Sequence, residues 1–126
     1  MAAISTTTLI AALVAMRTAM LGTSLVKGGW QEVDANPHPI WPYAEFDVET
    51  SSWDRQTFII TETIHSDESA AGRTIADTIV STLDGRSYQG TGVYLKSHLI
   101  TDGPKRRRAY EQTQFVIVWE VVALWH

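Results

Sequence analysis

The sequence contains no cysteine. Its absence excludes disulfide bonds, thiolate zinc sites and cysteine nucleophiles, so the fold must be stabilised by packing. Long apolar runs are also lacking. The segment Leu9 to Met16 has no basic region before it, and Arg17 ends it far short of the ~20 apolar residues that span a bilayer. We therefore expect a product of the cytoplasm with no signal peptide and no membrane span.

The motifs that usually carry chemistry are missing as well. Gly85, Gly90 and Gly92 are not followed by a helix-opening Lys-Ser/Thr pair, so they do not form a phosphate-binding loop. A serine on a strained glycine-flanked turn, as in hydrolases, is not present. We expect no cofactor and no enzymatic activity.

Histidines and carboxylates do not form a recognisable site. No two of the four histidines have the spacing of metal ligands, so we expect surface or hydrogen-bonded side chains and no metal; they are His38, His65, His98 and His126. Ser66 to Glu68, next to His65, comes nearest to a catalytic group, but a helix N-cap explains it more simply. Glu45, Asp47 and Glu49 share one strand face and indicate a solvated surface, with a catalytic carboxylate pair as the alternative.

The chain is long enough for one domain, which we assign to residues 1–126. Hydrophobic residues make up 44% and charged residues 19% of the sequence, as in ordinary globular proteins. The formal charge of −4 argues against sequence-independent binding to nucleic-acid phosphates, which needs an excess of Lys and Arg.

Two segments have the apolar spacing of amphipathic helices, Ser5 to Leu21 and Glu68 to Leu83. Four segments alternate or are rich in β-branched residues, which is typical of strands. They are Tyr43 to Glu49, Gln56 to His65, Gly92 to Ile100 and Tyr110 to Trp125.

These elements predict an α+β fold in the order α-β-β-α-β-β. A four-stranded, mostly antiparallel sheet with both helices on one face would bury every apolar stripe. Gly22 to Pro42 has little periodicity, and we expect it to be a long, mostly irregular connection. Thr101 to Arg108 is predicted to be the tip of a hairpin.

The basic run within this tip is the one concentrated charge in the sequence: Lys105, Arg106, Arg107 and Arg108. A solubilising turn that discourages strand pairing is the simpler interpretation. A contact with DNA or with an acidic protein surface is the alternative.

Five tryptophans are too many for one small core to bury completely: Trp30, Trp41, Trp53, Trp119 and Trp125. Because the large amphipathic indole is favoured at interfaces, we expect some of them, with Trp30, Trp41 and Trp125 as candidates, to meet a partner. Trp125 lies at the end of the last predicted strand, so it either contacts a neighbouring subunit or packs on its own core.

The arrangement of these segments resembles the tail-terminator, or tail-completion, proteins of long-tailed bacteriophages and related gene transfer particles. The resemblance covers most of the chain. It rests on the opening helix, Pro42-Tyr43 before a strand, Trp53 before the strand Gln56 to His65, the helix with Ile75, Ala76, Ile79 and Leu83, and the charged hairpin before Tyr110.

The resemblance implies a homo-oligomer, a hexameric ring that caps the tail tube and then meets the head connector or head-closure protein. It implies a place in the virion tail or neck, no cofactor, and possible contact with DNA in the channel. The sequence departs from the pattern in its longer connection, Trp30 to Pro42, and in the unusually basic Lys105 to Arg108. Two alternatives stay open: another neck component, such as an adaptor, or a small ligand-binding domain or enzyme.

Overall fold

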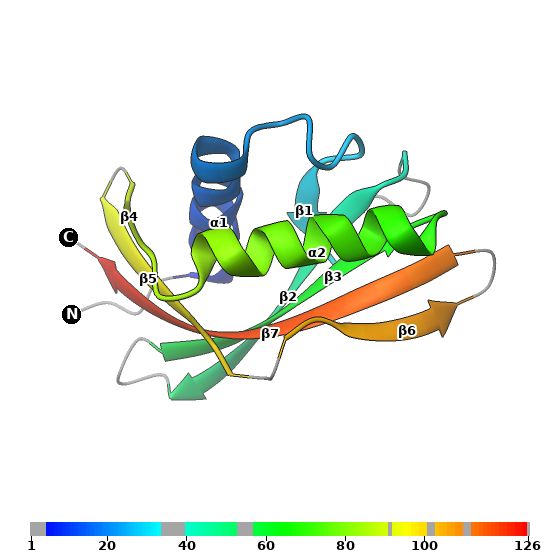
Figure 1. The fold of residues 1–126 in the computed structure, drawn as a ribbon. Helices are drawn as coiled ribbons and strands as arrows, with labels where there is room; N and C mark the ends of the chain where they lie inside the picture. The colour runs from blue at the N-terminus through cyan, green and yellow to red at the C-terminus, as the bar shows by residue number, and fades with distance from the viewer. Residues whose placement is uncertain are drawn as a thin grey trace.

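The structure is a computed structural model and describes residues 5–33, 40–52, 57–90, 92–100, 103–109 and 112–125. Its elements are α1 (Thr6–Leu21), β1 (Trp30–Glu32), β2 (Tyr43–Ser52), β3 (Thr57–Ser66), α2 (Ser69–Leu83), β4 (Ser87–Gln89), β5 (Val93–Leu99), β6 (Lys105–Ala109) and β7 (Gln112–Trp125). The sheet has the order β1-β2-β3-β7-β5-β4, and β6 also pairs with β7. Both helices lie on the same side of this curled sheet (Figure 1).

The α+β class, the mostly antiparallel sheet and the position of both helices are confirmed, but the prediction of four strands is wrong. The sheet has seven strands, because β1, β4 and β6 add to the edges of longer strands. β1 and β4 have only three residues each. Segments this short have too few residues to show a period, and they form because a neighbouring strand offers free hydrogen-bonding groups. The β1–β2 pair is parallel, and the other described pairs are antiparallel.

The first helix begins and ends where the sequence predicts. The Ser5 hydroxyl accepts a hydrogen bond from the Thr8 backbone N–H at 3.1 Å, which satisfies one of the free donors of the first turn. Gly22 ends the helix with φ 78°, a conformation that glycine adopts without strain. Leu9, Leu13 and Met16 lie on one face and are completely buried.

The second helix packs closely on the sheet through a small residue. A Cβ atom on Gly72 would lie only 2.9 Å from Cε2 of Phe115 and 3.0 Å from Cβ of Ser66, so α2 can approach β7 because residue 72 has no side chain. Ile79 and Leu83 on the same helix are completely buried.

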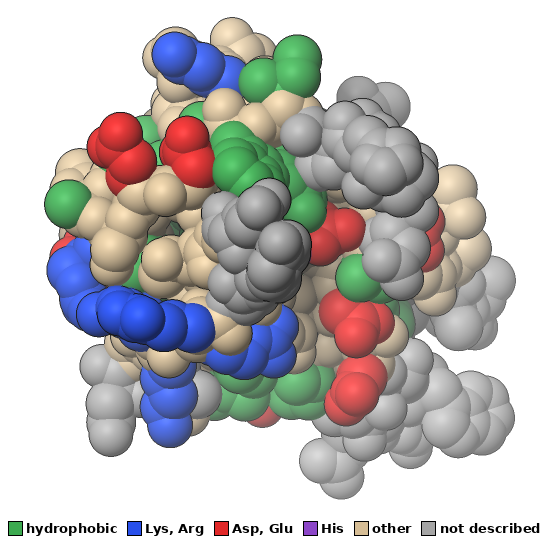
Figure 2. Space-filling model, turned by 90° about the vertical axis from the view of Figure 1, so that its right-hand side faces the viewer, with side chains coloured by type: hydrophobic (Ala, Val, Ile, Leu, Met, Phe, Trp, Pro, Cys, Tyr) green, Lys and Arg blue, Asp and Glu red, His purple; other side chains and the backbone are tan. Residues whose placement is uncertain are grey.

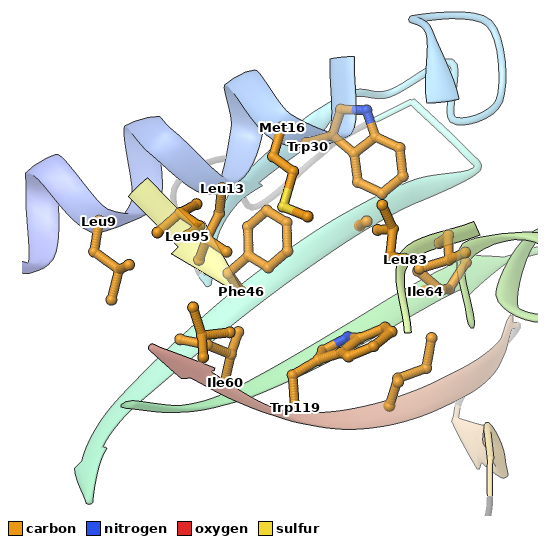
Figure 3. Packing of buried hydrophobic residues seen from close by; sticks show 14 of the residues in the cluster. Leu9, Leu13, Met16, Trp30, Phe46, Ile60, Ile64, Leu83, Leu95 and Trp119 are labelled. Carbon is orange, nitrogen blue, oxygen red and sulfur yellow. The ribbon is translucent and has the colours of Figure 1, made fainter. Parts of the chain in front are cut away.

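The core fills the space between the helices and the sheet. Trp119 of β7 and Phe46 of β2 are both fully buried and lie beneath the apolar faces of the helices (Figure 3). Every second residue of β3, from Phe58 to Ile64, also faces this core, which follows from the two-residue period of a strand.

A buried ion pair joins α1 to the sheet within this core. Arg17 of α1 donates from Nη2 to Glu62 Oε1 at 3.0 Å and from Nε to Oε2 at 3.2 Å, and both side chains are 0% exposed. The indole Nε1 of Trp119 donates to the same Glu62 Oε1 at 2.9 Å. The guanidinium carbon lies 5.2 Å from the Phe46 ring centre, within range of a cation–π contact. The charges therefore satisfy each other and fix the position of α1 on β3.

Candidate interaction surface

No described helix covers the second face of the sheet, which we call the open face (Figure 1). Because side chains alternate along a strand, every second residue of each strand points to this face, away from the helices, and most of these residues are at least partly exposed. The central strands β3 and β7 contribute mostly uncharged side chains to it: Ile59, Thr61, Thr63, Val116, Val118 and Val122. One carboxylate, that of Glu120 opposite Ile59, lies among them. A largely β-branched surface in the middle of an uncovered sheet suits contact with another protein.

A row of polar side chains crosses one end of the open face. Glu45 Oε1 of β2 lies 2.6 Å from His65 Nε2 of β3, and both side chains are largely buried. On the other side of the imidazole, Nδ1 lies 2.8 Å from Gln112 Oε1 and 3.3 Å from Gln114 Nε2 of β7. Arg107 Nε of β6 donates to Gln114 Oε1 at 2.7 Å. This cross-sheet row, Glu45–His65–Gln114–Arg107, connects four adjacent strands.

No local sequence pattern indicates this row, because its members lie far apart along the chain. Strand pairing places them together: Gln114 is opposite His65 on one side and opposite Arg107 on the other. A signal would have been available only if the register of β3, β7 and β6 had been known in advance.

The imidazole of His65 is largely buried and held by contacts on both of its nitrogens. It is 6% exposed and stacks on Tyr43, with ring centres 4.3 Å apart and planes at 3°. The neighbouring Ser66 points to the opposite face of the sheet, so the two residues do not form a nucleophile–base pair. The Ser66 hydroxyl instead accepts a hydrogen bond from the Glu68 N–H at 3.2 Å, which forms a turn just before α2. Glu68 is the N-cap of α2 and makes no side-chain capping hydrogen bond.

The basic run lies on a strand, so its predicted position at a hairpin tip is wrong. Lys105 to Arg108 form most of β6, which pairs with residues 112–116 of β7. The prediction failed because charged residues are rare in strand interiors, whereas β7 extends far enough to bind a further strand at its free edge. All four basic side chains are exposed. Lys105 and Arg107 belong to the open face, and Arg106 and Arg108 to the helix side.

The opposite edge of the sheet is acidic. Asp47 and Glu49 of β2 are exposed on the open face, and Glu32 of β1 is exposed nearby. Figure 2 shows Lys and Arg side chains in a band on the left and Asp and Glu side chains gathered on the right, with further acidic side chains above the band. The two edges of one sheet thus have opposite charge.

The exposed side of α1 has no charge, which is unusual for a surface helix. Arg17 is the one charged residue of α1, and it is buried. The outer side consists of small residues that border a shallow groove of about 240 Å³ next to β4 and β5. The groove is lined by Thr8, Ala11, Ala12, Ala15, Tyr88, Gly90 and Val93. Most of these residues are small or apolar, so the groove suits packing against another surface.

The tryptophans named as interface candidates have different environments. Trp30 is 9% exposed and packs on Phe46, with ring centres 6.5 Å apart. Trp41 is partly exposed and follows Ile40, whose exposure of 71% is the highest of the exposed large hydrophobic residues in the described chain. The side chain of Trp125, and all of Trp53, lie outside the described residues.

Groups suited to chemistry are scarce in the described part of the chain. There, no set of three or more His, Asp and Glu side chains could hold a metal ion. No helix within the described ranges is long and apolar enough to cross a membrane. The surface of the described residues is marked by an uncovered sheet face, two oppositely charged edges and an uncharged side of α1.

Neither a protein-family model nor a curated protein sequence matches this chain. A chain in the structure of the virion of a native gene transfer agent (GTA) particle has a similar fold, with a TM-score of 0.57 and 16% sequence identity. The match covers 86% of the present chain and 84% of the other. At this identity the comparison establishes a common fold.

Proposed function

We propose that this chain is a structural virion subunit that forms a ring, closes the end of a tail tube and joins it to the head connector. The similarity in fold to a GTA virion chain, over most of both chains, is the observation that carries the virion assignment. The resemblance of the sequence to tail-terminator proteins supports the more specific position at the end of the tail.

The surface supports a role in assembly. The open sheet face and the uncharged side of α1 are two separate surfaces, and each is suited to packing against protein. A ring subunit needs two such surfaces for its neighbours, and further ones for the tube and the connector. Its partners would therefore be copies of itself, the tube protein and the head-side protein, without an enzymatic step or a cofactor.

The first test is the mass of the purified chain in solution. Sedimentation velocity and negative-stain electron microscopy, with and without the tube protein, should show closed rings of about six copies. A chain that stays monomeric in both conditions would contradict the proposal, and stoichiometric binding of a small molecule by that monomer would favour a ligand-binding domain.

The position in the particle separates this role from that of another neck component. Particles lacking the chain should carry tails of uneven length or tails without heads, whereas loss of a head-side adaptor should leave tails of normal length. Electron cryomicroscopy of complete particles should locate the ring directly on the last layer of the tube. A location on the head side of the connector would favour the adaptor role.

A further inference from the structure

Two strand edges, on opposite sides of the sheet, have no partner strand among the described residues. β6 pairs with β7 on one side, and no described strand pairs with its other side. β2 pairs with β1 only at Ala44, Glu45 and Phe46, and the Val33 N–H reaches the Phe46 carbonyl at 2.9 Å. From Asp47 to Ser52, β2 has no second partner strand among the described residues.

We propose that β6 of one copy pairs with the free part of β2 of the next copy, so that the sheet continues from subunit to subunit around the ring. The occupant of each edge is thus a second copy of this chain. The inference rests on the ring-forming function proposed above and specifies its interface.

Charge selects this pairing over the two symmetric ones. Two β6 strands paired with each other would bring eight basic side chains together, twice the four in Lys105 to Arg108. Two β2 edges would likewise oppose Asp47 and Glu49 of both copies. Like charges across paired strands are destabilising and opposite charges are stabilising. The two edges therefore repel their own kind and attract each other.

Charged edges can also serve simply to prevent aggregation. That explanation needs charge on each edge but does not need the two edges to have opposite signs. Opposite signs favour a head-to-tail contact, and head-to-tail contacts form a ring when the rotation from one subunit to the next closes.

Strand direction agrees with the same arrangement. β2, β3, β7 and β6 are each antiparallel to the next, so β6 runs antiparallel to β2. If the next copy continues the sheet with its open face on the same side, β6 and β2 therefore meet as an antiparallel pair. Lys105 and Arg107 then share the open face with Asp47 and Glu49.

Length and strand face together fix the register, because five residues fit along six in two ways and only one of them places residues of the same face opposite each other. β6 has five residues, and it can lie opposite 47–51 without displacing β1 from Ala44 to Phe46. In this register Arg107 faces Glu49 directly, and Asp47 and Lys105 lie diagonally from this pair, within reach of long side chains.

Charge reversal on the open face tests the pairing. Lys105→Glu with Arg107→Glu, or Asp47→Lys with Glu49→Lys, should each weaken ring formation by about tenfold to a hundredfold. The matched control is Arg106→Glu with Arg108→Glu, which changes the charge of the same strand equally on the other face and should have a smaller effect. Far-UV circular dichroism and the thermal midpoint of each variant establish that it is folded.

Mixing the two open-face variants gives the decisive measurement. Each variant repels itself, but the acidic β6 of one fits the basic β2 of the other, so the mixture should recover rings in which the two alternate. Two outcomes would overturn the β6–β2 contact while wild-type rings leave the proposed function standing. In one the mixture does not recover rings, and in the other the single-edge variants assemble normally. Absence of wild-type rings, alone and with the tube protein, would overturn both.

The absence of native cysteine allows a second test of the register. Glu49→Cys and Arg107→Cys place one thiol on each edge, in separate proteins. Under mild oxidation the mixture should form a disulfide-linked dimer containing one of each, because directly opposite residues in paired strands have Cβ atoms about 4.5–5.5 Å apart. Dimers that form equally in each single-variant sample would show edge pairing of the symmetric kind and refute the proposal.

Discussion

The two faces of the sheet both carry an acid–base pair on β3, but the pairs have different surroundings. On the helix side Glu62 forms an ion pair with Arg17, and both side chains are 0% exposed. The indole N–H of Trp119 donates a further hydrogen bond to the Glu62 carboxylate. On the open face His65 meets Glu45 with side-chain exposures of 8% and 12%, at the margin of an uncovered surface. The helix-side pair is therefore enclosed by the fold itself, whereas the open-face pair lies where a partner protein can still cover it.

The largest effect is expected for breaking the enclosed pair. Glu62→Gln leaves the Arg17 guanidinium buried without a counter-charge, which typically costs ~3–5 kcal/mol of unfolding free energy. Chemical denaturation followed by circular dichroism measures the loss. Replacing both partners, as Arg17→Met with Glu62→Leu, should recover much of it, apart from the Trp119 N–H that loses its acceptor. If Glu62→Gln lowered the free energy of unfolding by less than the double variant does, the idea that Arg17 depends on Glu62 for its counter-charge would be contradicted.

A smaller loss is expected for an apolar truncation on the same side. Ile79 is 0% exposed, so Ile79→Ala should cost ~2–5 kcal/mol through lost burial and an incompletely filled cavity. Ile59→Ala on the open face is the matched control, and it should cost clearly less because Ile59 is partly exposed in the single chain. Equal shifts of the denaturation midpoint would mean that the two faces are not distinguished by burial.

On the open face, Glu45→Gln removes one charge from the cross-sheet row. The loss should be about 1–2 kcal/mol, since a charge-assisted hydrogen bond is replaced by a weaker neutral one that the amide can still form. Thermal unfolding of the isolated chain measures it. A loss as large as that of Glu62→Gln would show that this pair is as essential to the fold as the enclosed one.

The smallest effect belongs to the exposed basic side chains on the helix side of β6. Arg106→Glu with Arg108→Glu should change the free energy of unfolding by no more than about 0.5 kcal/mol for each substitution, as is usual for exposed positions. The midpoint of urea unfolding is a sufficient measurement. A larger destabilisation would indicate that these side chains stabilise the subunit itself.

Elements with strong local signals could be predicted from the sequence. The limits of α1 follow from Ser5 and Gly22, which act within one turn of the chain, and the long strands follow from their alternation. The short strands β1, β4 and β6 could not be predicted, because they depend on a distant strand that offers an edge. Lys105 to Arg108 even have the composition of a loop, and only β7 makes them a strand.

One member of the buried ion pair could be predicted from the alternation of residues along β3. Glu62 lies between Ile60 and Ile64 on the core side of β3, so strand alternation alone places a carboxylate among apolar residues. Such a residue requires a buried partner. The identity of that partner, Arg17, depends on where α1 packs, and local patterns do not determine helix packing.

The cross-sheet row has a mechanical consequence. Tension that pulls β2 and β6 apart acts across the strands, along the same direction as the backbone hydrogen bonds between them. The cross-sheet row, Glu45–His65–Gln114–Arg107, adds side-chain contacts along that direction. These contacts therefore resist separation of the strands together with the backbone hydrogen bonds. If both edges pair with neighbouring copies, a force that widens the ring is resisted by the cross-sheet row in every subunit.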